Sequence, residues 1–552
     1  MAEQIESYKV LCNGGLDTSE NHLALSENSS GSATRLVNYE VSLFGGYRRI
    51  NGFTKYDNLY SEVGVNTSNG SGVLATGQVL GVFLYRNLTT NADIVLAARK
   101  DAGANTYSFY YFVANSGWTK LTTGYTLSTT DSVRTVTKIR HVVFNFGSGN
   151  QICFVDGVNP ALVYDGTNWK QITSGGTGST SSYGGANALN TPSLVDVFEN
   201  TLFLSGDRTS QATVAYSSPN SPSNWTAAGG AGQLAVGYRV VQFKPFRDNL
   251  FIFGSNEIKK ASPDTTAGFV LDSVTANVGC ISADSVLEIG GDLVFLAPDG
   301  VRPVSGTSRI GDVEIESISK NAQALFSTLP KQYDLDTLNG VVIRGKSQLR
   351  YFIGDSTTPV GDSYGIIGGL RTADQRLGWE WGELLGIRTS CVLSGFIGNS
   401  EIILHGDYDG KIYKQEVGNN FDGENIIGIY ATPYLDYGDT EVRKILRKVN
   451  TFVRAEGPLT IGLQFDYDWG DDNTPKPASY EDSSAGAPVR YNDAVSEYGD
   501  ANVVYGGADK PVFTTTVQGS GFSARTTFVT NGQFAPHSIQ GVVYEFSISG
   551  RN

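Results

Sequence analysis

The stretch that decides the fold is DNLFIFGSNEIKKAS, residues 248–262. Asp248 and Asn249 form a polar turn before an apolar run at residues 250–253, whose members favour β-structure. Residues 254–256 break the run, and a second strand begins at Glu257. Turn, buried strand, turn and half-exposed strand in this order predict a β-hairpin.

The same hairpin design recurs along the chain. Seven segments align on their first apolar residue, and these anchors lie 43 to 58 residues apart: Ile94, Ile152, Leu202, Leu250, Leu293, Leu349 and Ile402. Short strands that repeat every ~40–50 residues are typical of a β-propeller with one four-stranded blade per repeat. A β-sandwich also alternates strands and turns, but it has no reason to repeat one hairpin seven times. We therefore predict a propeller of six to eight blades, with seven as the best match, over residues 75–420.

The length and composition indicate an all-β protein with more than one domain. The chain has 552 residues, which is too long for one compact core. It has 66 Gly, 28 Tyr and 27 Phe, and only 17% of its residues are charged, which suits many short strands and tight turns. We expect the N-terminal arm (1–74) and the C-terminal region (421–552) to combine as a β-sandwich-like platform. An acidic insertion at 466–509 adds no core to it.

Charge and cysteine content narrow the classes of function. The net charge of −14 disfavours a protein that grips nucleic acid through its phosphates, but not one that surrounds DNA without holding it. Four cysteines lie far apart in the sequence, so neither a zinc site nor a disulfide framework is expected. The N-terminus does not resemble a secretory signal, and no apolar run is long enough to span a membrane. These features predict folding in a reducing cytoplasm.

Several local patterns allow two interpretations. Residues 314–329 predict one amphipathic helix that ends at Pro330. Trp118, Trp169 and Trp225 are interpreted as packing residues rather than sugar platforms. Asp407-x-Asp409 is interpreted as part of a hairpin turn rather than a calcium loop, because no distal acid follows at the required spacing. The basic interval 443–454 is interpreted as a strand with a charged solvent face rather than a nucleic-acid patch.

Both ends of the chain carry motifs of a known family. Near the N-terminus these are Gly14-Gly15-Leu16, Asn38-Tyr39-Glu40, Gly45-Gly46, Arg48-Arg49 and Gly52-Phe53. AYSSPNSPSNW at 215–225 and HGDYDGKIY at 405–413 follow in the middle, and the C-terminal motif uses Ile539, Gly541, Glu545, Phe546, Gly550 and Arg551. In these segments the chain resembles the tail nozzle or tail hub proteins of short-tailed bacteriophages (podoviruses), also called tail tubular protein B or packaged-DNA stabilisation protein.

The resemblance implies a structural virion protein that is assembled in the host cytoplasm and located in the tail. In that family several copies, usually six, form a homohexameric ring below the portal and the adaptor, or head-to-tail connector. The ring continues the DNA channel, retains the packaged genome until ejection, carries tail fibres and meets a tail needle or plug. Double-stranded DNA passes through it without sequence-specific binding.

No catalytic motif stands out in the sequence. The four histidines lie in separate segments, and no nucleophile elbow, phosphate loop or metal-binding spacing is present. We therefore expect no enzyme activity and no cofactor. The alternative is a propeller-type receptor-binding or glycan-hydrolysing tail protein with two close carboxylates at the propeller axis.

Two sets of candidate residues follow from the proposed ring. Because the insertion is strongly acidic, we expect Asp471, Asp472, Glu481 and Asp482 to line or narrow the channel. We expect Tyr47, Arg48 and Arg49 to contact a neighbouring subunit or the adaptor, although the basic pair could also be a solvated strand end.

Overall fold

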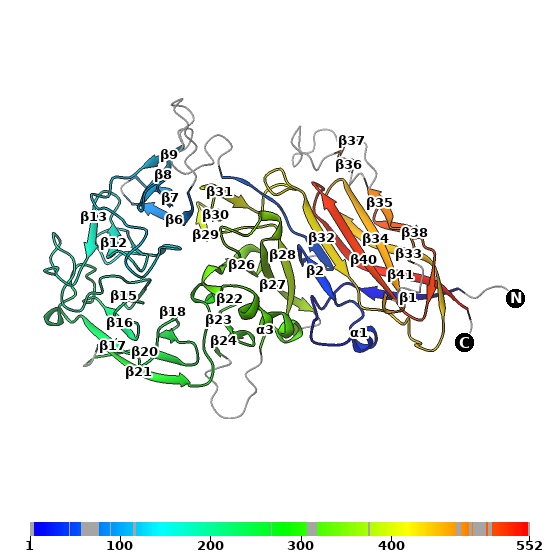
Figure 1. Ribbon diagram of the computed structural model, residues 1–552, viewed down its shortest axis with the longest axis horizontal. Coiled ribbons are helices and arrows are strands. Elements are labelled where there is room, and N and C mark those ends of the chain that lie inside the picture. Colours follow the sequence, from blue (N-terminus) through cyan, green and yellow to red (C-terminus); the bar gives the residue numbers. More distant parts are fainter. Residues whose placement is uncertain are drawn as a thin grey trace.

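The computed structural model describes residues 5–42, 45–56, 77–88, 90–113, 117–265, 268–305, 317–373, 376–470, 476–484, 488–489, 504–505 and 510–549. Most described elements are strands, and they form two bodies side by side (Figure 1). One body is a ring of small sheets and the other is a sandwich of two larger sheets. The predicted fold class, an all-β propeller joined to a sandwich-like platform, is confirmed.

Six small antiparallel sheets and the first four strands of a larger sheet surround the propeller axis. In chain order the strands are β6 (Val79–Asn87), β7 (Ala92–Lys100), β8 (Tyr107–Val113), β9 (Gly117–Lys120); β10 (Arg140–Phe144), β11 (Gln151–Val155), β12 (Ala161–Tyr164), β13 (Trp169–Ile172); β14 (Leu194–Phe198), β15 (Thr201–Ser205), β16 (Thr213–Tyr216), β17 (Gly232–Ala235); β18 (Gln242–Phe246), β19 (Asn249–Phe253), β20 (Ile258–Asp264), β21 (Gly268–Thr275); β22 (Leu287–Ile289), β23 (Asp292–Ala297), β24 (Gly300–Pro303); β25 (Asn339–Ile343), β26 (Gln348–Ile353), β27 (Tyr364–Ala373), β28 (Arg376–Leu385); β29 (Cys391–Ile397), β30 (Ser400–Gly406) and β31 (Ile412–Gln415).

The seven anchors of the sequence repeat all fall at equivalent places. Each lies on the second strand of its sheet, namely β7, β11, β15, β19, β23, β26 or β30. The first strands of neighbouring sheets contact one another around the ring, and the buried residues of β18–β19 pack on those of β23. The repeated hairpin therefore consists of the second and third strands of each blade.

The N-terminal arm is divided between the two bodies. The short strand β5 (Phe53–Lys55) pairs with β31 and completes the last blade, although we expected residues 1–74 to belong to the platform. A strand from the N-terminal part of the chain therefore completes the last blade and links it to the start of the propeller.

The platform consists of two facing sheets. One continues outward from β28 in the order β2, β32, β40, β34, β35; the other has the order β3, β4, β41, β33, β38, with β1 also paired to β41 and β39 to β33. Its strands, with the small separate pair β36 and β37, are β1 (Ile5–Leu11), β2 (Arg35–Val37), β3 (Tyr39–Val41), β4 (Tyr47–Arg49), β32 (Ile426–Ala431), β33 (Lys444–Ala455), β34 (Leu459–Tyr467), β35 (Tyr480–Ser484), β36 (Pro488–Val489), β37 (Val504–Tyr505), β38 (Val512–Thr516), β39 (Ser520–Gly521), β40 (Ala524–Gly532) and β41 (His537–Ile548).

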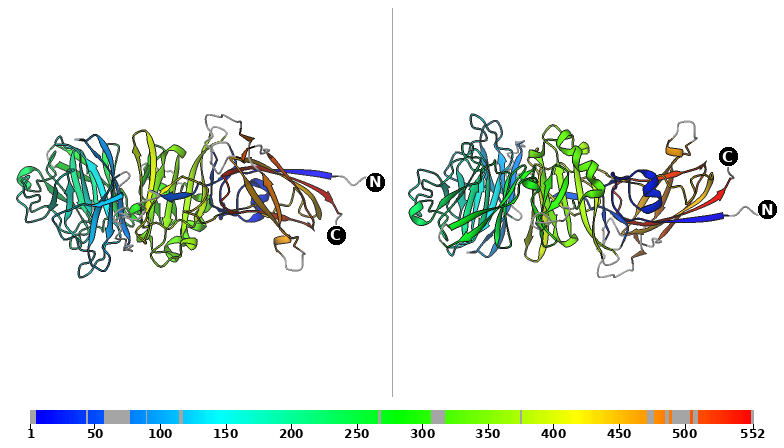
Figure 2. Two further views of the ribbon diagram at one scale, coloured as in Figure 1. Left: turned by 90° about the horizontal axis from the view of Figure 1, so that it is seen from above. Right: turned by 90° about the horizontal axis from the view of Figure 1, so that it is seen from below.

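The platform and the propeller share one sheet. Val37 of β2 pairs in parallel with Glu383 of β28, the outermost strand of its blade, and β2 also pairs with β32. Backbone hydrogen bonds therefore run from the propeller into the platform. Figure 2 shows the result, an elongated molecule with the propeller at one end and both chain ends at the far side of the platform.

Helices are few among the described residues. They are α1 (His22–Asn28) and α3 (Gln323–Gln332), the latter preceded by a 3-10 turn at Lys320–Ala322. The predicted helix at 314–329 was misplaced: residues 317–319 are not helical, and Pro330 lies inside α3 rather than ending it. Pro330 is tolerated there because Phe326 and Leu329 bury the helix against the propeller and α3 ends two residues later. No described helix has the length and apolar character that a membrane crossing requires.

Three of the local interpretations are supported. Trp118, Trp169 and Trp225 are all buried in blade cores, as expected of packing residues. Asp407 accepts two hydrogen bonds from the guanidinium of Arg388, which also pairs with Asp409. The basic interval lies largely on β33, whose buried and exposed residues alternate.

Candidate functional site

The N-terminal motif segments lie at the junction between propeller and platform. Gly14-Gly15-Leu16 docks on β28: the Gly14 amide donates to Glu380 Oε1 (3.0 Å) and the Leu16 amide to the Trp381 carbonyl (2.7 Å). Gly15 has φ +70°, and a Cβ at this position would lie 2.7 Å from the Trp381 nitrogen. Glycine is therefore required here by both conformation and space.

Asn38 joins the two bodies directly. It adopts a left-handed conformation with φ +56°, which Asn tolerates better than most residues. Its Nδ2 donates to the carbonyls of Leu385 in the propeller (3.0 Å) and Ile427 in the platform (2.8 Å). Its Oδ1 accepts from the Leu385 amide (3.0 Å). One side chain thus satisfies backbone groups of both β28 and β32.

A buried ionic cluster lies beside Asn38. We call it the junction cluster, and it comprises Glu40, Arg48, Lys346, Arg350, Glu416 and Glu456. Glu40 and Arg350 are only 2% and 1% exposed. Three acids face three bases, so the cluster is formally neutral. It draws on β3, β4 and β33 of the platform and on β26 and the end of β31 of the propeller.

Glu40 is the centre of the junction cluster. Its carboxylate accepts from Arg48 Nη1 (2.8 Å), from Lys346 Nζ (2.7 and 3.0 Å) and from Arg350 Nη2 (3.3 Å). Gln348 Nε2 donates a further bond at 3.1 Å. Because the carboxylate is almost inaccessible to solvent and accepts hydrogen bonds from four side chains, it fixes strands of both bodies relative to one another.

Glu416 is the second buried acid of the junction cluster. Burial alone would raise the pKa of its carboxyl, but the charges of Arg350 and Lys346 outweigh that effect and lower the pKa to about 2. Asn51 adds a hydrogen bond from Nδ2 (3.0 Å). Glu416 therefore stays ionised over the whole physiological pH range.

The predicted contact residues lie inside the molecule. Tyr47 and Arg49 are fully buried, so their side chains are not available to a partner. Arg49 donates to the carbonyls of Gly532 and Phe534, and burial lowers the pKa of its guanidinium to about 10. Arg48 is held by Glu40 and Glu456. Within this chain the basic pair binds β4 to the rest of the platform and is not a solvated strand end. A contact with a neighbouring subunit or the adaptor stays a prediction.

Of the predicted channel residues, Asp471 and Asp472 lie outside the described residues. Glu481 and Asp482 lie on β35, which pairs with β34 at the edge of the platform. Asp482 accepts from Lys510 Nζ (3.4 Å) and from Thr515, whereas Glu481 is exposed. This part of the insertion extends a sheet, which the sequence did not indicate.

A second polar cluster closes the propeller axis. Lys138 Nζ donates to Asp284 Oδ2 (2.8 Å), the Leu338 carbonyl (2.7 Å) and Asn339 Oδ1 (3.0 Å). Arg140 donates to both Asp284 oxygens (2.9 Å each). Burial lowers the pKa of the Lys138 ammonium; the same burial would raise the pKa of Asp284, but Arg140 and Lys138 hold it well below its usual range. We call these three residues the axial pin.

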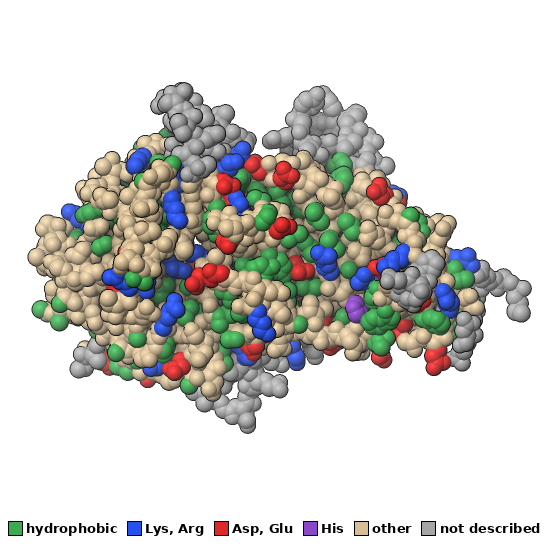
Figure 3. Space-filling model, viewed as in Figure 1, with side chains coloured by type: hydrophobic (Ala, Val, Ile, Leu, Met, Phe, Trp, Pro, Cys, Tyr) green, Lys and Arg blue, Asp and Glu red, His purple; other side chains and the backbone are tan. Residues whose placement is uncertain are grey.

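Two cavities lie along the propeller axis, one beside the axial pin. The cavity of about 390 Å³ is lined by residues that precede the first strands of several blades, including Arg134, Arg239 and Asp336, and by Asp156, which follows β11. The other, of about 430 Å³, is lined by residues of the first strands themselves, such as His141 and Asp196. Figure 3 shows acidic and basic side chains meeting near the middle of the propeller, whereas charges elsewhere on this face are scattered.

The carboxylates at the axis are mostly committed to structural bonds. Asp156 accepts from two backbone amides, from Asn159 and from Tyr107, and burial raises the pKa of its carboxyl. Asp284 belongs to the axial pin. Asp334 accepts from the Asp336 amide (3.0 Å), and both of these acids are exposed. Among described residues, no three or more His, Cys, Asp and Glu side chains are grouped so as to hold a metal ion.

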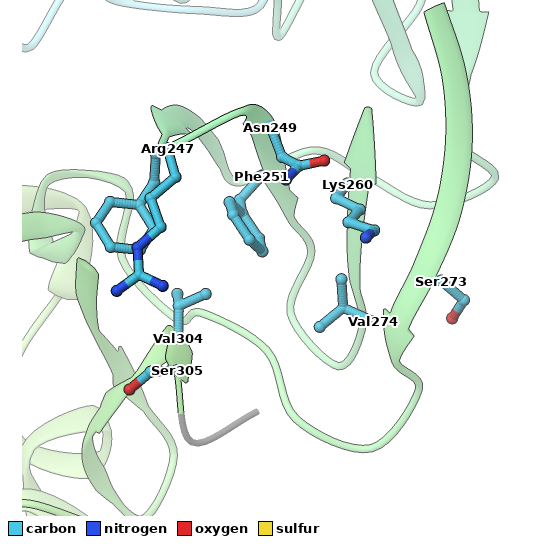
Figure 4. Close-up of a pocket in the computed structure, with 9 residues that line it drawn as sticks. Arg247, Asn249, Phe251, Lys260, Ser273, Val274, Val304 and Ser305 are labelled. Carbon is cyan, nitrogen blue, oxygen red and sulfur yellow. The ribbon is translucent and has the colours of Figure 1, made fainter. Parts of the chain in front are cut away.

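A smaller cavity of about 270 Å³ lies at the rim of the propeller (Figure 4). Arg247 and Lys260 flank Phe251, and the Arg247 guanidinium lies 5.0 Å from the ring centre of Phe246. Lys260 is paired across the strands with Asp272. The cavity therefore has no strong excess of positive charge, and nothing about it indicates a particular ligand.

Sequence reasoning missed the propeller half of the junction cluster and the axial pin. One signal was present: Arg350 is the only charged residue in the otherwise buried strand QLRYFI (348–353). A cation in such a strand requires an acid nearby. Its partners Glu40 and Glu416 are more than sixty residues away in sequence, so they could not be identified without the fold.

Comparisons with known proteins do not identify a family. No protein-family model matches the sequence, and no curated protein matches it. Among solved structures the chain is similar to an ancestral GH74 enzyme, at 8% identity and a TM-score of 0.37, over 63% of this chain and 49% of that one. It is also similar to Kluyveromyces lactis Hsv2 (10% identity, TM-score 0.26, 56% of this chain and 98% of that one).

A further similar structure is the extracellular domain of a hybrid two component system from B. thetaiotaomicron, at 10% identity and a TM-score of 0.32, over 66% of this chain and 39% of that one. The chain thus spans about half the length of the GH74 enzyme and less of the third structure. At such low identities these similarities carry no argument about function.

Proposed function

We propose that this protein is a structural component of a short phage tail. Several copies form a ring below the portal and adaptor, continue the DNA channel, retain the genome until ejection and carry the tail fibres. The observation that carries the proposal is the junction. The N-terminal motif segments that resemble the tail nozzle family lie there in contact with residues at the C-terminal end of the chain, where they fasten the propeller to the platform.

The junction supports this role because each subunit of a closed ring must keep a fixed shape. The two bodies share a sheet through β2 and β28, and the junction cluster adds charge-assisted bonds between them. Each subunit is therefore a rigid wedge rather than two domains on a flexible linker. Rigid wedges with different faces are what a closed cyclic ring requires.

The axial pin rules out a path for DNA along the propeller axis. It crosses the propeller axis between the second blade and the fifth and sixth blades, and the cavities beside it hold only about 390 and 430 Å³. DNA cannot thread a propeller closed in this way, so the channel lies between subunits at the ring centre. The net charge of −14 suits such a conduit, because the walls repel the phosphates.

In this proposal the carboxylates at the propeller axis have no catalytic role. Glycoside hydrolysis uses two carboxylates that face the scissile bond, one of them free to give a proton. Asp156 and Asp284 are instead bound by several donors each. We therefore infer a structural protein rather than an enzyme, and the glycan-hydrolysing alternative is tested together with the ring.

Electron microscopy of the purified chain is the direct test. We expect rings of one fixed copy number, with propellers projecting from a platform ring, and antibody labelling of the same protein at the tail of virions. Monomers that release sugars from host polysaccharide would contradict the proposal and favour the alternative. Rings without enzyme activity would leave only the structural role.

A further inference from the structure

One sheet of the platform is open at both edges. Among the strands that the structure describes, β1 pairs only with β41, and at the other side of the same sheet β38 pairs only with β33. Each edge strand therefore presents a row of backbone donors and acceptors to its surroundings. Such edges pair readily with other strands unless the protein guards them.

The β1 edge is weakly guarded. All seven residues of β1 pair with β41 without a bulge, and the strand has no proline. Ile5 and Leu11 are 63% and 54% exposed, which is unusual for large apolar side chains in a strand. The strand carries two charged residues, Lys9 on its exposed face and Glu6 half-buried on its inward face. Proteins that stay monomeric tend to protect an edge with bulges, prolines or several charges.

The two edges are complementary in direction. Pairing is antiparallel from β1 to β41, from β41 to β33 and from β33 to β38, so β1 and β38 run in opposite directions. If a second copy lies beside the first in the same orientation, its β38 meets β1 of the first copy as an antiparallel neighbour. The antiparallel hydrogen-bond pattern of the sheet then continues from one copy into the next.

The side chains are also compatible. On β1, Ser7 and Lys9 face solvent whereas Tyr8 and Val10 face the sandwich core. On β38 the buried positions are Phe513 and Thr515, between exposed Thr514 and Thr516. A register with Lys9 opposite Thr514 keeps outward residues with outward residues. It also places Leu11 beside Val512, which extends an apolar row already formed by Leu11, Gly541, Phe452 and Val512 within one copy.

We propose that β1 of one subunit pairs with β38 of the next, so that the platform sheets join into one continuous sheet around the ring. The inference rests on the proposed function and names the surface through which the ring closes. The contact is head-to-tail, which is the type that generates rings rather than pairs.

The size of the resulting sheet agrees with a conduit. Each copy supplies four strands across the sheet, β38, β33, β41 and β1. Six copies would supply about 24 strands, or a circumference of about 115 Å at ~4.8 Å per strand. Closed sheets of 16–18 strands already enclose a water-filled channel. A sheet of this size therefore leaves room for a wide passage.

Disulfide trapping tests the pairing. The four native cysteines are all buried, so introduced thiols are the accessible ones. In the full-length chain carrying Lys9→Cys and Thr514→Cys, directly opposed strand positions lie within disulfide range. We expect mild oxidation to convert most of the chain into a ladder of covalent oligomers that ends at the copy number of the ring. The control pair is Lys9→Cys with Ser273→Cys, whose second thiol lies on the exposed strand β21 of the propeller.

The outcomes separate this inference from the proposed function. Rings in the microscope without cross-linking by Lys9→Cys/Thr514→Cys would overturn the edge pairing and leave the ring intact. Dimers from Lys9→Cys alone would show that β1 pairs with β1 of a second copy, which also overturns it. A chain that forms no rings and no cross-links would refute both. Ladders from the Ser273 control would show random collision instead of pairing.

Discussion

Replacing Glu40 by Gln should loosen the joint between propeller and platform. The change removes one charge from the centre of the junction cluster and keeps the size of the side chain. Arg350 and Lys346 then keep only Glu416 as an acidic partner, and Arg48 keeps only Glu456. The local balance of charge moves from neutral to one excess positive charge in a site where Glu40 and Arg350 are almost inaccessible to water.

The expected loss follows from the cost of an uncompensated buried charge. Removing one partner of a buried ion pair costs ~3–5 kcal/mol, and because Glu416 remains close to Arg350 we expect about 3 kcal/mol. The free energy of unfolding is measured by urea denaturation at neutral pH. Hydrogen exchange should locate the effect in β2 and β32, the strands that join the two bodies.

Glu424→Gln is the matched control, because Glu424 is exposed and lies outside the cluster. It should change the unfolding free energy by less than about 0.5 kcal/mol. If Glu40→Gln costs under about 1 kcal/mol, or if exchange rises equally in all blades, then the junction cluster does not hold the two bodies together. The reasoning that makes the subunit a rigid wedge would then fail.

Three further predictions concern the same contacts. Because the folded-state pKa of Glu416 is about 2, below its unfolded value, its contribution to stability is present above about pH 4.5 and is lost as the pH falls toward 2; acid titration of wild type should be steeper in that window than titration of Glu416→Gln. Lys138→Met should destabilise the propeller by about 1–3 kcal/mol, because the Leu338 carbonyl and Asn339 Oδ1 lose their donor, while Lys138→Met with Asp284→Leu should destabilise it further, because Arg140 then loses its acidic partner; calorimetry of both variants measures the difference. Gly15→Ala should reduce soluble expression and thermal stability strongly, whereas Gly103→Ala, at a similar φ but with no atom near its Cβ, should have a much smaller effect.

Much of the fold could be predicted because it depends on local patterns. Period-two alternation and turn residues located the hairpins, and seven anchors spaced 43 to 58 residues apart identified the propeller before any contact was known. The helix was misplaced because its apolar spacing continues through residues 317–319, where tertiary hydrogen bonds such as Ile318 N to Val301 O hold the backbone in a non-helical turn.

The candidate residues were predicted less well, and the reason is distance along the chain. Arg48 and Arg49 stood out as charges on a strand end, and nothing in their neighbourhood of sequence showed that Glu456 and the carbonyls of β40 and its following turn would enclose them. Residues that become buried through partners hundreds of positions away are indistinguishable, in sequence, from residues that face solvent.

The sequence by itself determined the all-β character, the number of repeats and the acidity of the chain, since each depends on composition or on intervals of a few tens of residues. Only the tertiary structure decided that β5 closes the ring, that β28 continues into the platform, and that Glu40 and Lys138 stand at the centres of buried ionic clusters. The physical reason is that buried charges are tolerated only where opposite charges from remote segments converge, and that convergence is a property of the folded chain.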